Sequence, residues 1–128
     1  MDITLGLKGI AKETVSAENT AAKVGSGSLP VFATPIMVAL MEKAACAALE
    51  GHLDEGSTTV GTMLNIEHVA ATPVGMAVTA ESTVTAVDGR KVCFDVAAYD
   101  EAGLIGKGKH ERFIVNAEKF TAKTNAKK

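Results

Sequence analysis

The chain has 128 residues, a length that suits one domain with a hydrophobic core of its own. Thirteen Lys and Arg against fifteen Asp and Glu give a net charge of -2, and the four Phe and one Tyr are scattered along the chain. We therefore expect no nucleic-acid-binding face. The N-terminus lacks a long apolar core behind a basic start, which predicts a cytoplasmic protein without a membrane segment.

The two cysteines, Cys46 and Cys93, have neither the spacing of metal ligands nor that of a disulfide framework. Their apolar neighbours favour small buried side chains, and free thiols fit a reducing compartment. No metal site is predicted.

Two short strands are predicted near the N-terminus. Ile3, Leu5 and Leu7 alternate with polar or small residues, and residues 20–24 fit a second strand after a turn. Residues 25–28, with the sequence GSGS, form a flexible connection. Such a segment can border a binding site or simply link two elements.

Residues 31–51 predict a helix that is apolar on nearly every side. From position 36 to position 49 the only charged residues are Glu42 and Lys43, so we expect protein to surround this helix on most sides. A carboxylate in such surroundings loses hydration and needs a hydrogen bond, a cation or a proton. Carboxylates of this kind are enriched at functional sites.

The remaining chain alternates with period two and predicts four strands, over residues 58–69, 76–87, 90–99 and 104–116. The dipeptide Asp88-Gly89 predicts a hairpin with a type I′ turn, so the last strands are antiparallel. One helix and an antiparallel sheet of five or six strands make an α+β architecture in which the sheet curls around the helix.

We expect residues 1–120 to form this single domain and residues 121–128 to form a solvated, partly disordered tail. A sheet with open edges and one helix leaves other surface uncovered. This predicts pairing across a two-fold axis into a homodimer.

Alternation divides the first long strand into two faces. One face holds Val60, Thr62, Leu64, Ile66 and His68, and the other holds Thr59, Gly61, Met63, Asn65 and Glu67. The Val/Leu/Ile face should cover the helix, so His68 points toward the same interior as Glu42. A His at the end of a strand is more often structural than catalytic, and the pattern alone leaves both interpretations open.

Thr34 is expected to be the N-cap of the helix, with Pro35 at the first helical position. Most N-cap threonines are purely structural. A helix N-terminus also presents free N–H groups, which can hold an oxyanion or a phosphate. Together with Glu42 and His68, the hydroxyl supplies the groups needed for acyl transfer to water.

Three segments of the chain resemble the fluoroacetyl-CoA thioesterase family of hot-dog-fold proteins. They are VFAT ending at Thr34 with Glu42 eight residues on, IEHVAATPVG with His68, and GKGKHERFIV over residues 106–115. The resemblance spans most of the chain. It implies a hot-dog fold, a dimer with active sites near the subunit boundary, and hydrolysis of an acyl-CoA thioester to a free acid and coenzyme A without a metal or other cofactor.

The resemblance implies catalytic roles for Thr34, Glu42 and His68. His68 would perform acid/base work and contact the thioester. Glu42 would attack the thioester or activate water, and Thr34 would position or assist that carboxylate. Residue types leave open which of Thr34 and Glu42 is the nucleophile, and whether an acyl-enzyme forms.

Gly61 and Arg112 are the candidate substrate-binding residues beside His68. Gly61 can let a ligand approach the backbone, or it can mark a bulge. Arg112 matches a family arginine associated with the ligand site, and a surface or interface ion pair is the alternative. Residues 25–29 lack an aromatic side chain that the fluoroacetate-specific enzyme carries ahead of its helix, so we expect some short or medium acyl-CoA as substrate without assigning fluoroacetyl-CoA.

Two other functions suit the same fold. One is a hot-dog hydratase or dehydratase that acts on enoyl or hydroxyacyl thioesters, and the other is a protein that binds an acyl-CoA without turning it over. The combination of Thr, Glu and His favours hydrolysis.

Overall fold

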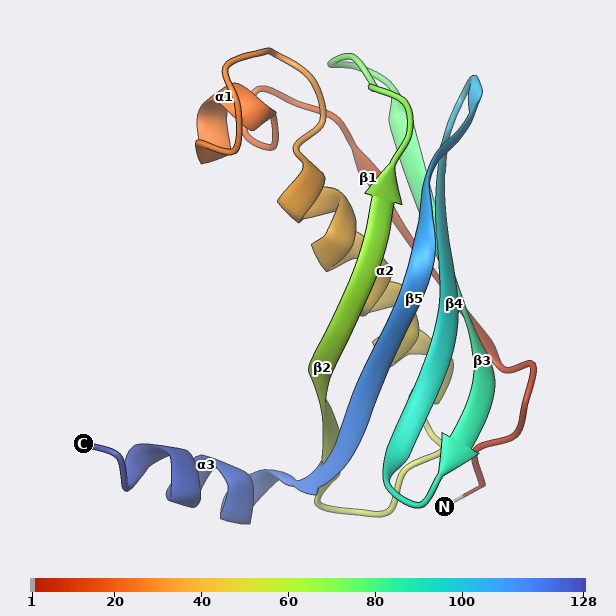
Figure 1. Cartoon of the computed structure of the whole chain (residues 1–128), viewed down its shortest axis with the longest axis vertical. Coiled ribbons are helices and arrows are strands. Elements are labelled where there is room, and N and C mark those ends of the chain that lie inside the picture. The colour runs from red at the N-terminus through yellow and green to blue at the C-terminus, as the bar shows by residue number, and fades with distance from the viewer. Residues whose placement is uncertain (1) are drawn as a thin grey trace.

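A long helix, α2 (Thr34–Leu49), lies against one face of a curved antiparallel sheet in the computed structural model, which describes residues 2–128 (Figure 1). This arrangement confirms the predicted α+β architecture. The other elements are β1 (Lys8–Thr14), α1 (Ala21–Val24), β2 (Ser57–His68), β3 (Ala77–Asp88), β4 (Lys91–Asp100), β5 (Gly103–Asn116) and α3 (Ala117–Asn125).

The sheet has five strands in the order β1-β3-β4-β5-β2, and every neighbouring pair is antiparallel. The four predicted strands after the helix are confirmed to within a residue at each end, because alternation and turn residues both mark them. Their order in space is less simple, since β2 pairs with β5 rather than with β3. This crossing leaves β1 and β2 at the two edges of the sheet (Figure 1).

One side of α2 packs on the sheet and the other side stays uncovered in the single chain. The buried side chains are Met37, Leu40, Met41, Ala44, Ala45, Ala48 and Leu49. Ala39, Lys43 and Ala47 on the opposite side are exposed. We predicted that protein surrounds this helix on most sides. Within one chain, protein covers only one side of it. No helix among residues 2–128 has the length and apolar character needed to cross a membrane.

The two strands predicted near the N-terminus were misplaced. The first strand is β1 at residues 8–14, and its inward positions are Gly9 and Ala11 while Ile10 is half exposed. These inward residues are too small to give a visible hydrophobic pattern, and Gly9 is required because a Cβ there would overlap the α2 backbone at Ala44. Residues 3–7 form irregular chain and a turn instead.

Residues 21–24 form the short helix α1 rather than a strand. Thr20 caps it, because its hydroxyl accepts a hydrogen bond from the backbone N–H of Lys23 at 3.2 Å. Gly25 ends it in the left-handed conformation with φ of 84°. The caps at both ends therefore favour a helix over the predicted strand in this segment.

The hairpin between β3 and β4 forms as predicted, but its turn differs from the predicted type. Its central residues are Gly89 and Arg90, and only Gly89 has a positive φ, so the turn is not type I′. Residues 121–125, expected to belong to a solvated tail, form the end of the exposed helix α3, which Asn116 caps.

Candidate active site

Thr34 and His68 meet in a pocket at the N-terminal end of α2. A hydrogen bond of 2.7 Å joins Thr34 Oγ1 to His68 Nδ1, although the two residues are 34 positions apart. The pocket has a volume of about 300 Å³ and is also lined by Ser26, Phe32 and Ala70. The segment of residues 25–28 ahead of the helix thus borders this pocket.

Thr34 is not the N-cap of α2, as had been expected. Ala33 occupies that position without a side-chain cap, and Thr34 is the first helical residue. Its hydroxyl is bound to the imidazole of His68 instead of to the helix backbone. A hydroxyl freed from capping is available for chemistry at the pocket.

The His68 ring lines the pocket and has one buried nitrogen, Nε2, without a hydrogen-bond partner among residues 2–128. Burial lowers the pKa of His68 below its ordinary value of 6.5, and the backbone of Ala70 partly offsets this shift. At neutral pH the imidazole is therefore mostly neutral and can accept a proton, as a general base must.

Glu42 lies on the sheet side of α2, two turns from Thr34, and pairs with Arg112. Arg112 Nη1 donates to Glu42 Oε2 at 3.1 Å. The Arg112 side chain is 8% exposed and that of Glu42 is 34% exposed. Arg112 therefore does form an ion pair, but its guanidinium is buried against the helix carboxylate rather than placed at the surface.

Thr59 holds Arg112 from a second side. Arg112 Nε donates to Thr59 Oγ1 at 2.8 Å, and Nη2 donates to the Thr59 carbonyl at 3.1 Å. The guanidinium plane is consequently fixed by β2 as well as by α2. A fixed fork of donors presents its charge to Glu42 in one orientation.

Gly61 makes room for the Glu42 carboxylate. A Cβ at this position would lie 2.5 Å from Glu42 Oε2 and 3.4 Å from Arg112 Nη1. Within the single chain this glycine therefore serves close packing of the carboxylate.

A β-bulge beside Gly61 corrects the predicted division of β2 into two faces. The register with β5 shifts between Gly61 and Met63, so Thr62 is the extra residue. Gly61 lies opposite Arg112, and His68 lies opposite Gly106, which touches Met37 of the helix. His68 does face the interior as predicted, but Thr59 and Gly61 share its side while Val60 does not.

The three predicted catalytic residues do not meet within one chain. Eight helical positions separate Thr34 from Glu42, a rise of about 12 Å along α2. Thr34 and His68 form one contact, and Glu42 forms a separate cluster with Arg112. Within one chain the three candidate residues therefore lie in two separate clusters, which we call half-sites.

Two residues of the Arg112 cluster had no predicted role. They are Thr59 and His110, and His110 Nε2 lies 3.2 Å from Arg112 Nη1. The signal that could have found His110 is its position two residues before Arg112, because residues i and i+2 of a strand share a face. Thr59 was obscured by the bulge, which alternation does not reveal.

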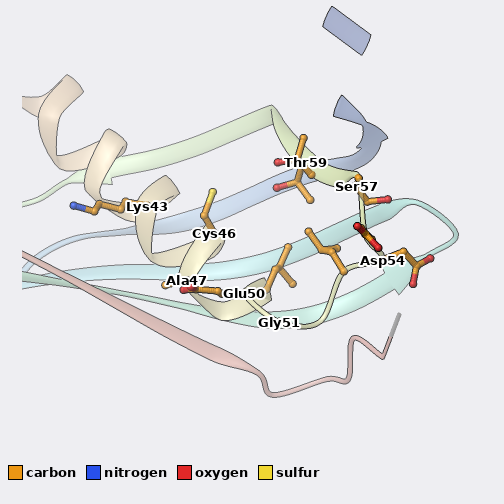
Figure 2. Close-up of a pocket in the computed structure, with 13 residues that line it drawn as sticks. Lys43, Cys46, Ala47, Glu50, Gly51, Asp54, Ser57 and Thr59 are labelled. Carbon is orange, nitrogen blue, oxygen red and sulfur yellow. The ribbon is translucent and has the colours of Figure 1, made fainter. Parts of the chain in front are cut away.

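A larger pocket of about 600 Å³ lies at the other end of α2, beside the start of β2 (Figure 2). Figure 2 shows Lys43, Cys46 and Glu50 on the helix side and Asp54, Ser57 and Thr59 on the opposite side. Cys46 is exposed here, which corrects its prediction as a buried side chain, and Cys93 is half-buried. No group of three or more His, Cys, Asp or Glu within residues 2–128 is arranged to hold a metal ion.

Comparison with known proteins matches this chain to thioesterases. A family model described as fluoroacetyl-CoA-specific thioesterase matches residues 15–118. A fluoroacetyl-CoA thioesterase from Streptantibioticus cattleyicolor is 42% identical over 97 residues, which are 76% of this chain and 70% of that protein.

Solved structures give the same result and confirm the predicted hot-dog fold. A structure of the fluoroacetyl-CoA thioesterase FlK matches with a TM-score of 0.92 and 34% identity over 100% of this chain and 99% of that one. A Thermus thermophilus protein, described as a thioesterase superfamily member, matches with a TM-score of 0.90 and 31% identity over 98% and 93% of the two chains.

Proposed function

Because this chain belongs to the fluoroacetyl-CoA-specific thioesterase family, we propose that it hydrolyses short or medium acyl-CoA thioesters to the free acid and coenzyme A. The observation that carries the proposal is the Thr34–His68 pair, which lines a pocket and in which the buried His68 Nε2 has no partner within residues 2–128. A thioester placed there would supply the missing contact.

The proposed roles follow from the chemistry of each side chain. In one route the oxygen of water forms a bond to the thioester carbon, His68 accepts a proton from that water, and the C–S bond breaks. In the other route the Glu42 carboxylate forms that bond and the C–S bond breaks, which gives an anhydride that water then hydrolyses while His68 accepts the proton of the water. In both routes the proton on His68 passes to the coenzyme A thiolate. Thr34 orients the imidazole through their hydrogen bond. Both routes end in a free acid and coenzyme A, and neither requires a metal or other cofactor.

We propose that the complete site forms in a homodimer, from Thr34 and His68 of one protomer and Glu42 of its partner. Three features of the chain support this. Glu42 is about 12 Å along the helix from Thr34, one side of α2 is uncovered, and β2 is an open edge strand (Figure 1). Pairing two β2 edges across a two-fold axis would cover both surfaces and bring the half-sites together.

The lining of the pocket supports a range of acyl groups rather than one specific acyl group. Ser26 and Ala21 line it on the side of the segment that precedes the helix, where the side chains are small. We therefore propose a range of short to medium acyl chains. A cytoplasmic location is proposed as well, because both cysteines are free and Cys46 is exposed.

Purified protein incubated with a panel of acyl-CoAs, from acetyl-CoA to medium chain lengths, is expected to release free coenzyme A. A thiol-reactive dye measures the release, and a chelator added to a parallel sample is expected to leave the rate unchanged. An enoyl-CoA followed for loss of its conjugated absorbance serves as the control for hydration. Water addition without thiol release, or binding without any product, would contradict the proposal.

Replacing Gly61 with alanine is expected to lower kcat by about tenfold to a hundredfold, because small displacements of a reacting group are costly. The new Cβ would displace the end of the Glu42 side chain, which is flexible, so the thermal midpoint should change little. Thiol release and thermal unfolding measure the two effects. The matched control is Thr62→Ala at the neighbouring exposed position, and equal kcat in both variants would show that Gly61 has no role in placing Glu42.

A further inference from the structure

His110 is a fully buried ionisable side chain with no role in the reaction described above. It lies on the inner face of β5, opposite Leu64 of β2. Its ring stacks on Phe94 of β4, with 5.8 Å between centroids and 26° between planes. An imidazole in a hydrophobic core needs partners for both nitrogens, since an unpaired polar atom there is costly.

The hydrogen bonds of His110 fix its tautomer. Nδ1 lies 2.9 Å from the carbonyl oxygen of Met63, which can only accept, so Nδ1 carries the hydrogen. Nε2 then has a free lone pair and faces Arg112 Nη1 at 3.2 Å, which can only donate. Burial lowers the pKa of His110, and the positive charge of Arg112 acts in the same direction. The ring is thus an uncharged acceptor at neutral pH.

An uncharged acceptor suits this position because Arg112 serves two partners. Its Nη1 faces both His110 Nε2 and Glu42 Oε2. A carboxylate in place of the imidazole would compete with Glu42 for the guanidinium charge. The imidazole instead completes the hydrogen bonding of Arg112 and leaves that charge for Glu42.

We propose that His110 is a positioning residue of the thioesterase reaction, which orients the Arg112 guanidinium through Nε2 and, through it, the Glu42 carboxylate. Three elements then converge on one guanidinium: Thr59 on β2, His110 on β5 and Glu42 on α2. The inference rests on the proposed function, because it assigns Glu42 to the reaction.

Three substitutions separate the two hydrogen bonds of the ring. His110→Phe keeps the stacking on Phe94 and removes both bonds. His110→Asn can still donate to the Met63 carbonyl, and its side chain is too short to reach Arg112. His110→Gln extends an amide oxygen about as far as Nε2 and can accept from Arg112.

We expect kcat to fall by roughly tenfold to a hundredfold in His110→Phe and His110→Asn, because a hydrogen bond to a charged group is lost. KM should stay within about threefold, since no contact of the ring with substrate is involved. His110→Gln should recover most of kcat. Thiol-release kinetics measure all three variants, and His52→Phe, a change at a loop histidine, is the matched control.

A structural role alone would lower the thermal midpoint and leave kcat of the folded protein unchanged in every variant. That result would overturn the inference about His110. The proposed function would still stand, because the wild-type protein would be active. Equal losses of kcat in His110→Asn and His110→Gln would also overturn it, because the acceptor would then have no effect. An inactive wild-type protein would instead reject the proposed function itself, so the two failures are distinguishable. If His110→Phe does not fold, the Asn and Gln pair still decides.

Discussion

His68→Ala and Glu42→Gln are each expected to lower kcat by about 10²- to 10⁴-fold, the usual contribution of a positioned acid, base or nucleophile. His68→Ala removes the imidazole that lines the pocket and is bound to Thr34. Glu42→Gln keeps the shape of the side chain and an oxygen that can accept from Arg112, and it removes the charge. Thiol release from the best acyl-CoA of the panel measures both losses.

Neither loss should arise from unfolding. His68 is at the rim of the core, and glutamine preserves the packing of residue 42 against Gly61. Thermal midpoints close to that of the wild type are therefore expected. His52→Ala provides the matched control, since this loop histidine contacts Asp2, which belongs to neither half-site. A Glu42→Gln variant with wild-type kcat would remove Glu42 from the chemistry and leave the Thr34–His68 pair as the only reacting groups.

The strands after the helix were predictable because two independent signals agree there. Side chains alternate over each run, and Gly or Pro marks each turn, so β3, β4 and β5 fall where the pattern places them. The first strand gave neither signal. Its inward residues are Gly9 and Ala11, and their size is set by the α2 backbone, which the sequence does not display.

Residue type, position and resemblance predict Thr34, Glu42 and His68 as the candidate site, but they do not predict its geometry. The structure brings Thr34 and His68 together and places Glu42 beside Arg112. The bulge at Thr62 depends on backbone pairing with β5, so side-chain alternation placed Gly61 and Thr59 on the wrong face. His110 was overlooked because a strand histidine shows its purpose only when its hydrogen-bond partners are known.

The distance between Thr34 and Glu42 along α2 does not follow from which face of the helix each residue occupies. Thr34 and Glu42 lie on the same helix, but two helical turns keep them apart, and each has a different partner. Under the proposed function the three groups act on one carbon atom, which this spacing does not allow within one chain. In the proposed homodimer a second copy would supply the missing group.

Mixing Glu42→Gln and His68→Ala chains is therefore expected to restore activity that neither variant has alone. A heterodimer joins the intact His68 of one chain to the intact Glu42 of the other, which rebuilds one of two sites. The two-tag purification described next keeps only heterodimers, each with one intact site of two, so we expect about half of the wild-type rate per dimer. Co-expression with two different tags, followed by sequential affinity purification and the thiol assay, measures it.

The matched control for this experiment is a mixture of Thr34→Val and His68→Ala chains. Thr34 and His68 form their hydrogen bond within one chain, so every site in such a mixture lacks one of them and no activity should return. Restoration in the control mixture but not in the first would place Glu42 with His68 of its own chain. A protein that sediments only as a monomer at assay concentration while remaining fully active would also contradict the shared site, because the half-sites of one chain would then suffice.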